Sequence, residues 1–216
     1  MQKSIRKPAG KPVAKAAHKP AHAPRQVRII GGAWKRTPLA VVDADGLRPT
    51  PDRVRETVFN WLNHLLDGAW ERSAFLDLFA GSGALGFEAA SRGARQVISV
   101  EAFTPAVRQM EEVKAKLKAD AITILRGDAL ATADSLARRG QRFDVIFLDP
   151  PFQQEWLDRV LPLCPPLLAE GGLVYVEWQQ SLAAGGAAAL PAWMDGWEVV
   201  RADKAGMVFF HLLQRK

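Results

Sequence analysis

The segment Asp149-Pro150-Pro151-Phe152 holds the residue types of this chain that most directly suggest chemistry. Proline has no backbone N–H, so the carbonyl of Pro150 stands beside the Asp149 carboxylate without a neighbouring donor to occupy it. Two acceptors so placed can hold the two hydrogens of an –NH2 group, and Phe152 can stack on a flat ring. The segment therefore predicts a catalytic site for a planar amine, formed by these four residues, with a purely structural turn as the alternative.

A glycine-rich segment from Asp77 to Gly86 predicts a ligand site at the end of another expected strand. The spacing Gly81-x-Gly83-x-x-Gly86 lets the backbone turn tightly at a helix start, which favours negative charge. This spacing suits a dinucleotide as well as S-adenosylmethionine. Asp77 favours the second, because a carboxylate before the turn would face the amino group of a methionine moiety and repel a pyrophosphate.

Two further acids are expected to read the adenosine part of the same cofactor. Glu101, at the end of an expected strand, can accept both ribose hydroxyls. Asp128 can accept a hydrogen bond from the adenine amine, or cap the helix that follows, or do both. The expected S-adenosylmethionine site, with no metal, comprises Asp77, Phe79, Gly81, Ser82, Gly83, Glu101, Ala102, Asp128 and Ala129.

Short apolar runs alternate with helical patterns over most of the chain. Strands are expected near 74–79, 96–101, 121–125, 143–148, 172–177, 197–202 and 206–213, and helices near 83–92, 104–119, 130–139 and 153–168. This alternation predicts an α/β, Rossmann-like fold with a seven-stranded, mostly parallel sheet and helices on both faces. The last two strands are joined by too few residues for a parallel crossover, so the final strand should be antiparallel.

Charge is concentrated at the start of the chain. Of 29 basic and 23 acidic residues, residues 1–42 hold ten basic ones and no acidic one. This asymmetry favours a nucleic-acid partner, with a solubilising tail as the alternative. Prolines and sparse apolar residues predict disorder over 1–26. The single cysteine, Cys164, excludes an internal disulfide and is expected to be buried and inert, and no apolar run reaches membrane-spanning length.

Residues 27–50 are expected to form a hairpin that contacts nucleic acid, followed by a domain over 51–216 that binds S-adenosylmethionine. Basic side chains next to Trp34 suit phosphate contact and base stacking, although a small sheet packed on the main domain is equally consistent. Thr50 is the expected N-cap of a helix that runs through Leu66, with Pro51 as its first residue. Arg55 is expected to be a surface charge or a substrate contact. The residues expected to contact nucleic acid are Arg28, Lys35, Arg36, Arg48, Thr50 and Arg53.

With these motifs the chain resembles the Rossmann-like S-adenosylmethionine-dependent methyltransferases that carry an (Asp/Asn)-Pro-Pro-(Phe/Tyr) signature. A narrower resemblance is to the bacterial 16S ribosomal RNA guanine-N2 methyltransferases that act on the small subunit. It spans the chain from about Val27 to the C-terminus. Its motifs are Arg28-Ile29-Ile30-Gly31-Gly32, Arg48-Pro49-Thr50-Pro51-Asp52-Arg53-Val54-Arg55-Glu56, Phe59-Asn60-Trp61-Leu62, Asp77–Gly86 and Asp149–Phe152.

The resemblance implies methyl transfer from S-adenosylmethionine to the N2 amine of a guanine in 16S ribosomal RNA. It implies a cytoplasmic monomer whose substrate is naked RNA or an assembled small-subunit particle. A DNA adenine-N6 methyltransferase would use the same four residues, but this chain has no room for a target-recognition domain. A methyltransferase of protein glutamine typically has Asn in place of Asp149. An NAD-dependent oxidoreductase and a non-catalytic RNA-binding protein are the alternatives from other classes.

Overall fold

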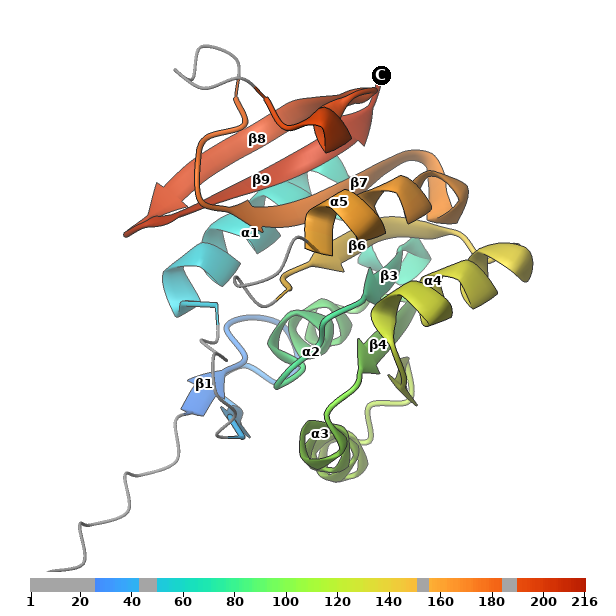
Figure 1. Cartoon of the computed structure of the whole chain (residues 1–216). Helices are drawn as coiled ribbons and strands as arrows, with labels where there is room; N and C mark the ends of the chain where they lie inside the picture. The colour runs from blue at the N-terminus through green and yellow to red at the C-terminus, as the bar shows by residue number, and fades with distance from the viewer. Residues whose placement is uncertain (1–25, 43–49, 151–155, 184–189) are drawn as a thin grey trace, which may run out of the picture.

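Seven strands between Ala74 and Arg215 build one sheet, in the order β5-β4-β3-β6-β7-β9-β8 (Figure 1). The structure is a computed structural model and describes residues 26–42, 50–150, 156–183 and 190–216. The strands are β3 (Ala74–Asp77), β4 (Gln96–Glu101), β5 (Ile122–Arg126), β6 (Phe143–Leu148), β7 (Leu168–Trp178), β8 (Trp197–Ala205) and β9 (Val208–Arg215).

The directions of these strands confirm the fold expected from the sequence. β3 to β7 run parallel, whereas β9 is antiparallel to both β7 and β8. Ala205 pairs with Val208, so β8 runs past its expected end at 202 and the last turn lies at Gly206-Met207. β3 and β6, in the middle of the sheet, are buried on both faces, as strands of parallel sheets usually are, whereas the edge strand β5 is partly exposed.

Helices cover both faces of the sheet, which also confirms the prediction. The helices α1 (Asp52–Leu65), α2 (Ala84–Ser91) and α3 (Thr104–Leu117) pack on one face, and α4 (Ala129–Arg138) and α5 (Trp156–Val160) on the other (Figure 1). Each face has its own apolar core. Phe59 and Met110 belong to the first core, and Leu136 and Val160 to the second.

The prediction of a helix over 153–168 is wrong for most of that stretch. In the described part of this stretch, 156–168, only α5 is α-helical, and two 3-10 turns follow it, η2 (Leu161–Leu163) and η3 (Pro165–Leu167). Proline has no N–H to donate and its ring clashes with the preceding turn, so the three prolines of this stretch prevent a continuous α-helix. β7 consequently begins at Leu168 rather than near 172. Further 3-10 turns are η1 (Trp70–Arg72) and η4 (Ala192–Met194).

A small hairpin precedes the sheet, as expected. Its strands, β1 (Gln26–Arg28) and β2 (Pro38–Ala40), pair in antiparallel fashion. Val27, Ile29 and Leu39 are buried in the same core as α1 and α2, so the hairpin is packed on the main domain. The basic tail expected over 1–26 lies outside the described residues, apart from Gln26.

Two expectations from composition can be compared with the structure. Cys164 is fully buried and burial raises the pKa of its thiol far above the ordinary value, as expected for an inert cysteine. Within the ranges that the structure describes, no helix combines the length and the apolar character needed to cross a membrane.

Candidate active site

Acidic residues stand at the carboxyl ends of four neighbouring strands. In the sheet order β5-β4-β3-β6 they are Asp128, Glu101, Asp77 and Asp149. The chain proceeds from β3 to β4 and β5 on one side and then returns to β6 on the other, so the strand order switches between β3 and β6. Ligands of open α/β sheets bind at such a switch point. The fold therefore gathers these four predicted residues along one edge of the sheet.

The glycine turn after β3 has the backbone geometry that the sequence suggested. Gly81 and Gly83 have positive φ angles of 53° and 77°. A Cβ atom on Gly83 would lie 2.8 Å from the ring of Phe87, so both space and conformation favour glycine there. α2 begins directly after Gly83 and no side chain caps its start. A helix start of this kind presents backbone N–H groups to a ligand.

Asp77 is a buried carboxylate at the switch point. Its residue is 1% exposed, and among the described residues no side chain donates to its carboxylate, although the nearby backbone N–H groups of Phe79 and Gly86 lower its pKa in part. Burial raises the pKa of Asp77 to about 7, and the charge of Glu101 contributes in the same direction. A buried acid without a partner favours a cationic ligand group. The amino group of a methionine moiety fits this requirement, and the residues present therefore suit S-adenosylmethionine.

Glu101 and Asp128 both accept hydrogen bonds from backbone N–H groups. Glu101 accepts hydrogen bonds from the backbone N–H groups of Gly81, at 2.8 Å, and Phe103, at 2.7 Å. Each of its oxygens keeps a lone pair for a ribose hydroxyl. Asp128 accepts a hydrogen bond from Ala131 N at 2.9 Å, which confirms it as the cap of α4. Its contact with adenine stays a prediction.

The other expected cofactor residues lie around these acids. Phe79 is half-buried, with its ring centroid 5.4 Å from that of Trp156 in α5. Ser82 lies in the glycine turn between Gly81 and Gly83. Ala102, directly after β4, is exposed, whereas Ala129, the first residue of α4, is buried.

Asp149 lies in a cluster of polar groups that the sequence did not predict. The Thr50 hydroxyl donates a hydrogen bond of 2.9 Å to Asp149 Oδ2. Burial and then the charge of Glu177 hold the pKa of Asp149 well above its ordinary value, while the Thr50 hydrogen bond acts in the opposite direction. Pro150 is buried beside Asp149, and Pro151 and Phe152 lie outside the described residues.

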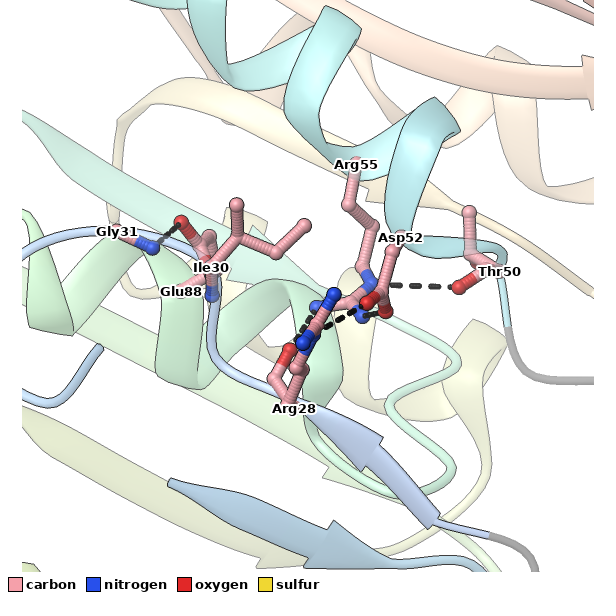
Figure 2. Close-up of polar contacts among 7 residues, drawn as sticks. All are labelled: Arg28, Ile30, Gly31, Thr50, Asp52, Arg55 and Glu88. Atoms are coloured by element: carbon pink, nitrogen blue, oxygen red, sulfur yellow. Dashed lines mark hydrogen bonds and ion pairs between the residues drawn. The ribbon is translucent and has the colours of Figure 1, made fainter. Parts of the chain in front are cut away.

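Thr50 is therefore not the N-cap of α1, and that prediction is wrong. Pro51 occupies the cap position without a side-chain hydrogen bond, because the Thr50 hydroxyl is directed to Asp149 instead. Arg55 is also neither a surface charge nor a free substrate contact. Its fully buried guanidinium donates to the backbone carbonyls of Thr50 and Arg28 and pairs with Asp52 (Figure 2). Arg55 thus fixes Thr50 and the hairpin relative to α1.

A second anchor ties the hairpin to α2. The fully buried Glu88 carboxylate accepts hydrogen bonds from the backbone N–H groups of Ile30, at 2.6 Å, and Gly31, at 2.9 Å (Figure 2). It also pairs with Arg92 at 2.8 Å. Ser91 donates its hydroxyl proton to the Gly31 carbonyl. The helix that starts at the glycine turn therefore also holds the basic hairpin.

The residues expected to contact RNA differ in how exposed they are. Lys35, Arg36 and Arg53 are exposed, and Arg28 pairs with Asp52 at 2.7 Å while its side chain stays 65% exposed. Trp34 is half-buried against the core rather than free on both faces. Thr50 is buried at 5% exposure, and Arg48 lies outside the described residues.

Sequence reasoning missed two acids that the structure makes prominent, Glu88 and Glu177. Glu177 stands at the carboxyl end of β7, which is the same signal that singled out Glu101, so it could have been found. Glu88 lies within a helix whose other residues are mostly small or apolar. Its partners are 57 and 58 residues away along the chain. An acid in an apolar helix was the one available signal.

Comparisons with known proteins agree with this geometry. The family described as "Conserved hypothetical protein 95" matches residues 27–214. The ribosomal RNA small subunit methyltransferase D of Escherichia coli K12 is 39% identical over 193 residues, covering 88% of this chain and 91% of the relative. Its Haemophilus influenzae counterpart is 34% identical, covering 88% and 94%. The solved structure of the Escherichia coli protein yhhF is 36% identical with a TM-score of 0.72, covering 89% and 99%.

Proposed function

The chain belongs to the family described as conserved hypothetical protein 95, and on this premise we propose that it methylates 16S ribosomal RNA with S-adenosylmethionine. The acceptor is the N2 exocyclic amine of a guanine. Relatives that cover most of the chain are named ribosomal RNA small subunit methyltransferase D, which supports the substrate class. A ribosomal substrate also places the reaction in the cytoplasm.

One observation carries the proposal, namely the two acids on either side of the switch point, of which Asp77 is buried and Asp149 is partly buried. Asp77 ends β3, and among the described residues no side chain donates to it or forms an ion pair with it, which suits a site for a cationic group. Asp149 follows β6, the strand next to β3, and its carboxylate can accept from an amine. A site with an acid for each substrate places the methyl donor beside the acceptor.

The chemical task is to make a poor nucleophile react. The lone pair of an exocyclic amine is delocalised into the ring, so the amine of guanine attacks slowly. When bound, S-adenosylmethionine supplies a methyl group activated by a sulfonium centre. The Asp149 carboxylate and the Pro150 carbonyl hold the amine hydrogens, and each hydrogen bond to a charged group contributes about 1.5–3 kcal/mol. Alignment of the two reactants contributes more, up to about 7–11 kcal/mol.

The RNA approaches from the side of the hairpin. Lys35, Arg36 and Arg53 are exposed there, and Arg28 stays largely exposed despite its ion pair with Asp52. Such side chains bind phosphate without reading sequence. The target guanine must leave its stack to reach Asp149, which costs a few kcal/mol. Phe152 is one of the four residues assigned to the catalytic site, and its ring replaces that stacking.

The experiment combines product identification with one variant. Full-length protein is incubated with small-subunit particles that lack the modification, and with naked 16S RNA, and the nucleosides are then analysed by mass spectrometry. N2-methylguanosine is the expected product. Asp149→Ala should bind S-adenosylmethionine in calorimetry as the wild type does but lose about 100-fold or more of the rate. Asp158→Asn, at an exposed acid of α5, is the matched control. Methylated adenine, or normal turnover by Asp149→Ala, would contradict the proposal.

A further inference from the structure

A second buried acid stands next to Asp149, and the proposed function does not use it. β6 and β7 are parallel neighbours in which Leu148 pairs with Val176. The residues that follow this pair, Asp149 and Glu177, therefore leave the two strands side by side. Glu177 is only 7% exposed. The strand register thus brings two carboxylates into one interior site.

Thr50 and Tyr175 connect these carboxylates. Thr50 donates its one hydroxyl proton to Asp149 Oδ2 at 2.9 Å, and the same hydroxyl lies close enough to Glu177 to lower the pKa of that carboxyl. The Tyr175 hydroxyl donates to Glu177 Oε1 at 2.7 Å. The charged groups that face Asp149 are Glu177 and Asp77, and both are acidic. Within the described ranges no Lys or Arg side chain forms an ion pair with either carboxylate of the pair.

Two adjacent buried carboxylates without a cation do not ionise independently. The charge on one disfavours the charge on the other, so the pair loses its two protons in separate steps. A purely structural role would explain the contact between Tyr175 and Glu177. It would not explain why Glu177 stands beside the acid that meets the substrate, where its charge acts on Asp149.

We propose that Glu177 is a positioning residue for methyl transfer, which acts through Asp149 and keeps that carboxylate basic enough to accept the proton released by the methylated amine. This inference rests on the proposed function. The nitrogen lone pair forms the N–C bond while the methyl–sulfur bond breaks, and that electron pair stays on sulfur. One N–H bond then breaks, its electrons stay on nitrogen, and the proton passes to Asp149 and later to water.

The rate against pH distinguishes this role from a structural one. Transfer requires an ionised Asp149, so the rate falls as pH drops through the pKa of the pair. Glu177→Gln keeps the shape and an acceptor for Tyr175 but removes the neighbouring charge, so the acid limb should move down by about one pH unit, a tenfold change in proton affinity. Thr50→Val removes the hydrogen bond that stabilises the charged form of Asp149, so the acid limb of this variant should move to higher pH. General destabilisation cannot produce shifts of opposite sign.

Single-turnover rates on small-subunit particles from pH 5 to 8 are the first measurement. Glu177→Asp, which keeps the charge, and Glu170→Gln, at an exposed acid of the same strand, should both keep the wild-type limb. An unmoved limb in Glu177→Gln overturns the proposal, and so does a lower plateau without a shift.

Carboxyl 13C NMR of the free protein gives a readout that does not depend on the RNA substrate. Asp149 should titrate at lower pH in Glu177→Gln than in the wild type, even if the particle proves to be the wrong substrate. If Glu177→Gln does not fold, the wild-type and Thr50→Val titrations decide. Two separated, mutually dependent carboxyl titrations that move up in Thr50→Val support the pair, and independent ones overturn it.

Discussion

Replacing Asp77 with Asn should stabilise the free protein and at the same time weaken its binding of S-adenosylmethionine. Asp77 is 1% exposed, and burial raises the pKa of its carboxyl from 3.8 to about 7. A group whose pKa is raised in the folded state stabilises that state fully below its unfolded pKa, and this contribution is lost as pH rises through the folded value. The loss falls between about pH 4 and pH 7 and is complete at pH 8.

The size of the effect follows from the pKa. At about 1.4 kcal/mol per pH unit, a change from 3.8 to about 7 corresponds to about 4 kcal/mol. Asparagine has the same shape and no charge, so the free energy of unfolding of Asp77→Asn relative to wild type should increase by up to about 4 kcal/mol from pH 4 to pH 8. The lost hydrogen bond to an ammonium group, worth about 1.5–3 kcal/mol, should lower the affinity for S-adenosylmethionine about 10- to 150-fold.

Urea unfolding at several pH values and calorimetry with the cofactor measure both effects. Asp195→Asn, at an exposed acid, is the control for the change in net charge and should alter neither quantity. The reasoning would be refuted if Asp77→Asn lost stability at pH 8, or if the variant bound the cofactor as tightly as wild type. The first result would mean that the carboxylate has a partner in the free protein, and the second that it does not meet the ligand.

Two further predictions concern the hairpin. Gly32→Ala should destabilise the protein by more than about 2 kcal/mol in thermal unfolding, because φ is 73° and a Cβ would lie 1.8 Å from the carbonyl oxygen of Ser91. Gly206→Ala, with φ at 62° and no atom within 4 Å, carries the backbone strain alone and should lose about 1 kcal/mol, so equal losses would exclude the clash. Joint replacement of Lys35 and Arg36 by Ala should reduce the salt slope of RNA affinity by between about one and two, as filter binding at several salt concentrations can measure, and should not alter cofactor affinity. An unchanged slope would remove these side chains from the RNA contact.

The sheet could be predicted because each of its buried strands has a signal in the local sequence. Each buried strand, such as β6, is a short apolar run, and each ends at a polar residue or a glycine turn. The acids at Asp77, Glu101 and Asp149 were found for the same reason, since an acid at the end of a buried strand is visible in the sequence. The failed helix over 153–168 shows the limit of periodicity. Apolar spacing favoured a helix, but the missing N–H groups of Pro162, Pro165 and Pro166 prevented it.

The contacts around the site could not be predicted, because they join residues far apart in the chain. Thr50 has the local signature of a helix cap, yet its hydroxyl reaches Asp149, 99 residues away. Arg55 similarly looks like a surface charge on a helix, and only the packing of the hairpin against α1 buries it. Local patterns identify which groups are polar, but the fold decides which of them meet.

The two anchors of the hairpin hold the proposed RNA-contact residues and the glycine turn proposed for the cofactor on one support. α2 starts at Gly83, the end of the glycine turn, and within three turns it holds the hairpin through Glu88 and Ser91. Arg55 holds the same hairpin to α1 and to Thr50, which contacts Asp149. A misplacement of about 1 Å between reacting groups can reduce a rate about 100-fold. A chain that aligns a base with a methyl donor, as proposed, therefore gains from buried charged side chains whose hydrogen bonds to the hairpin backbone link these parts, which accounts for Glu88 and Arg55 lying in the interior.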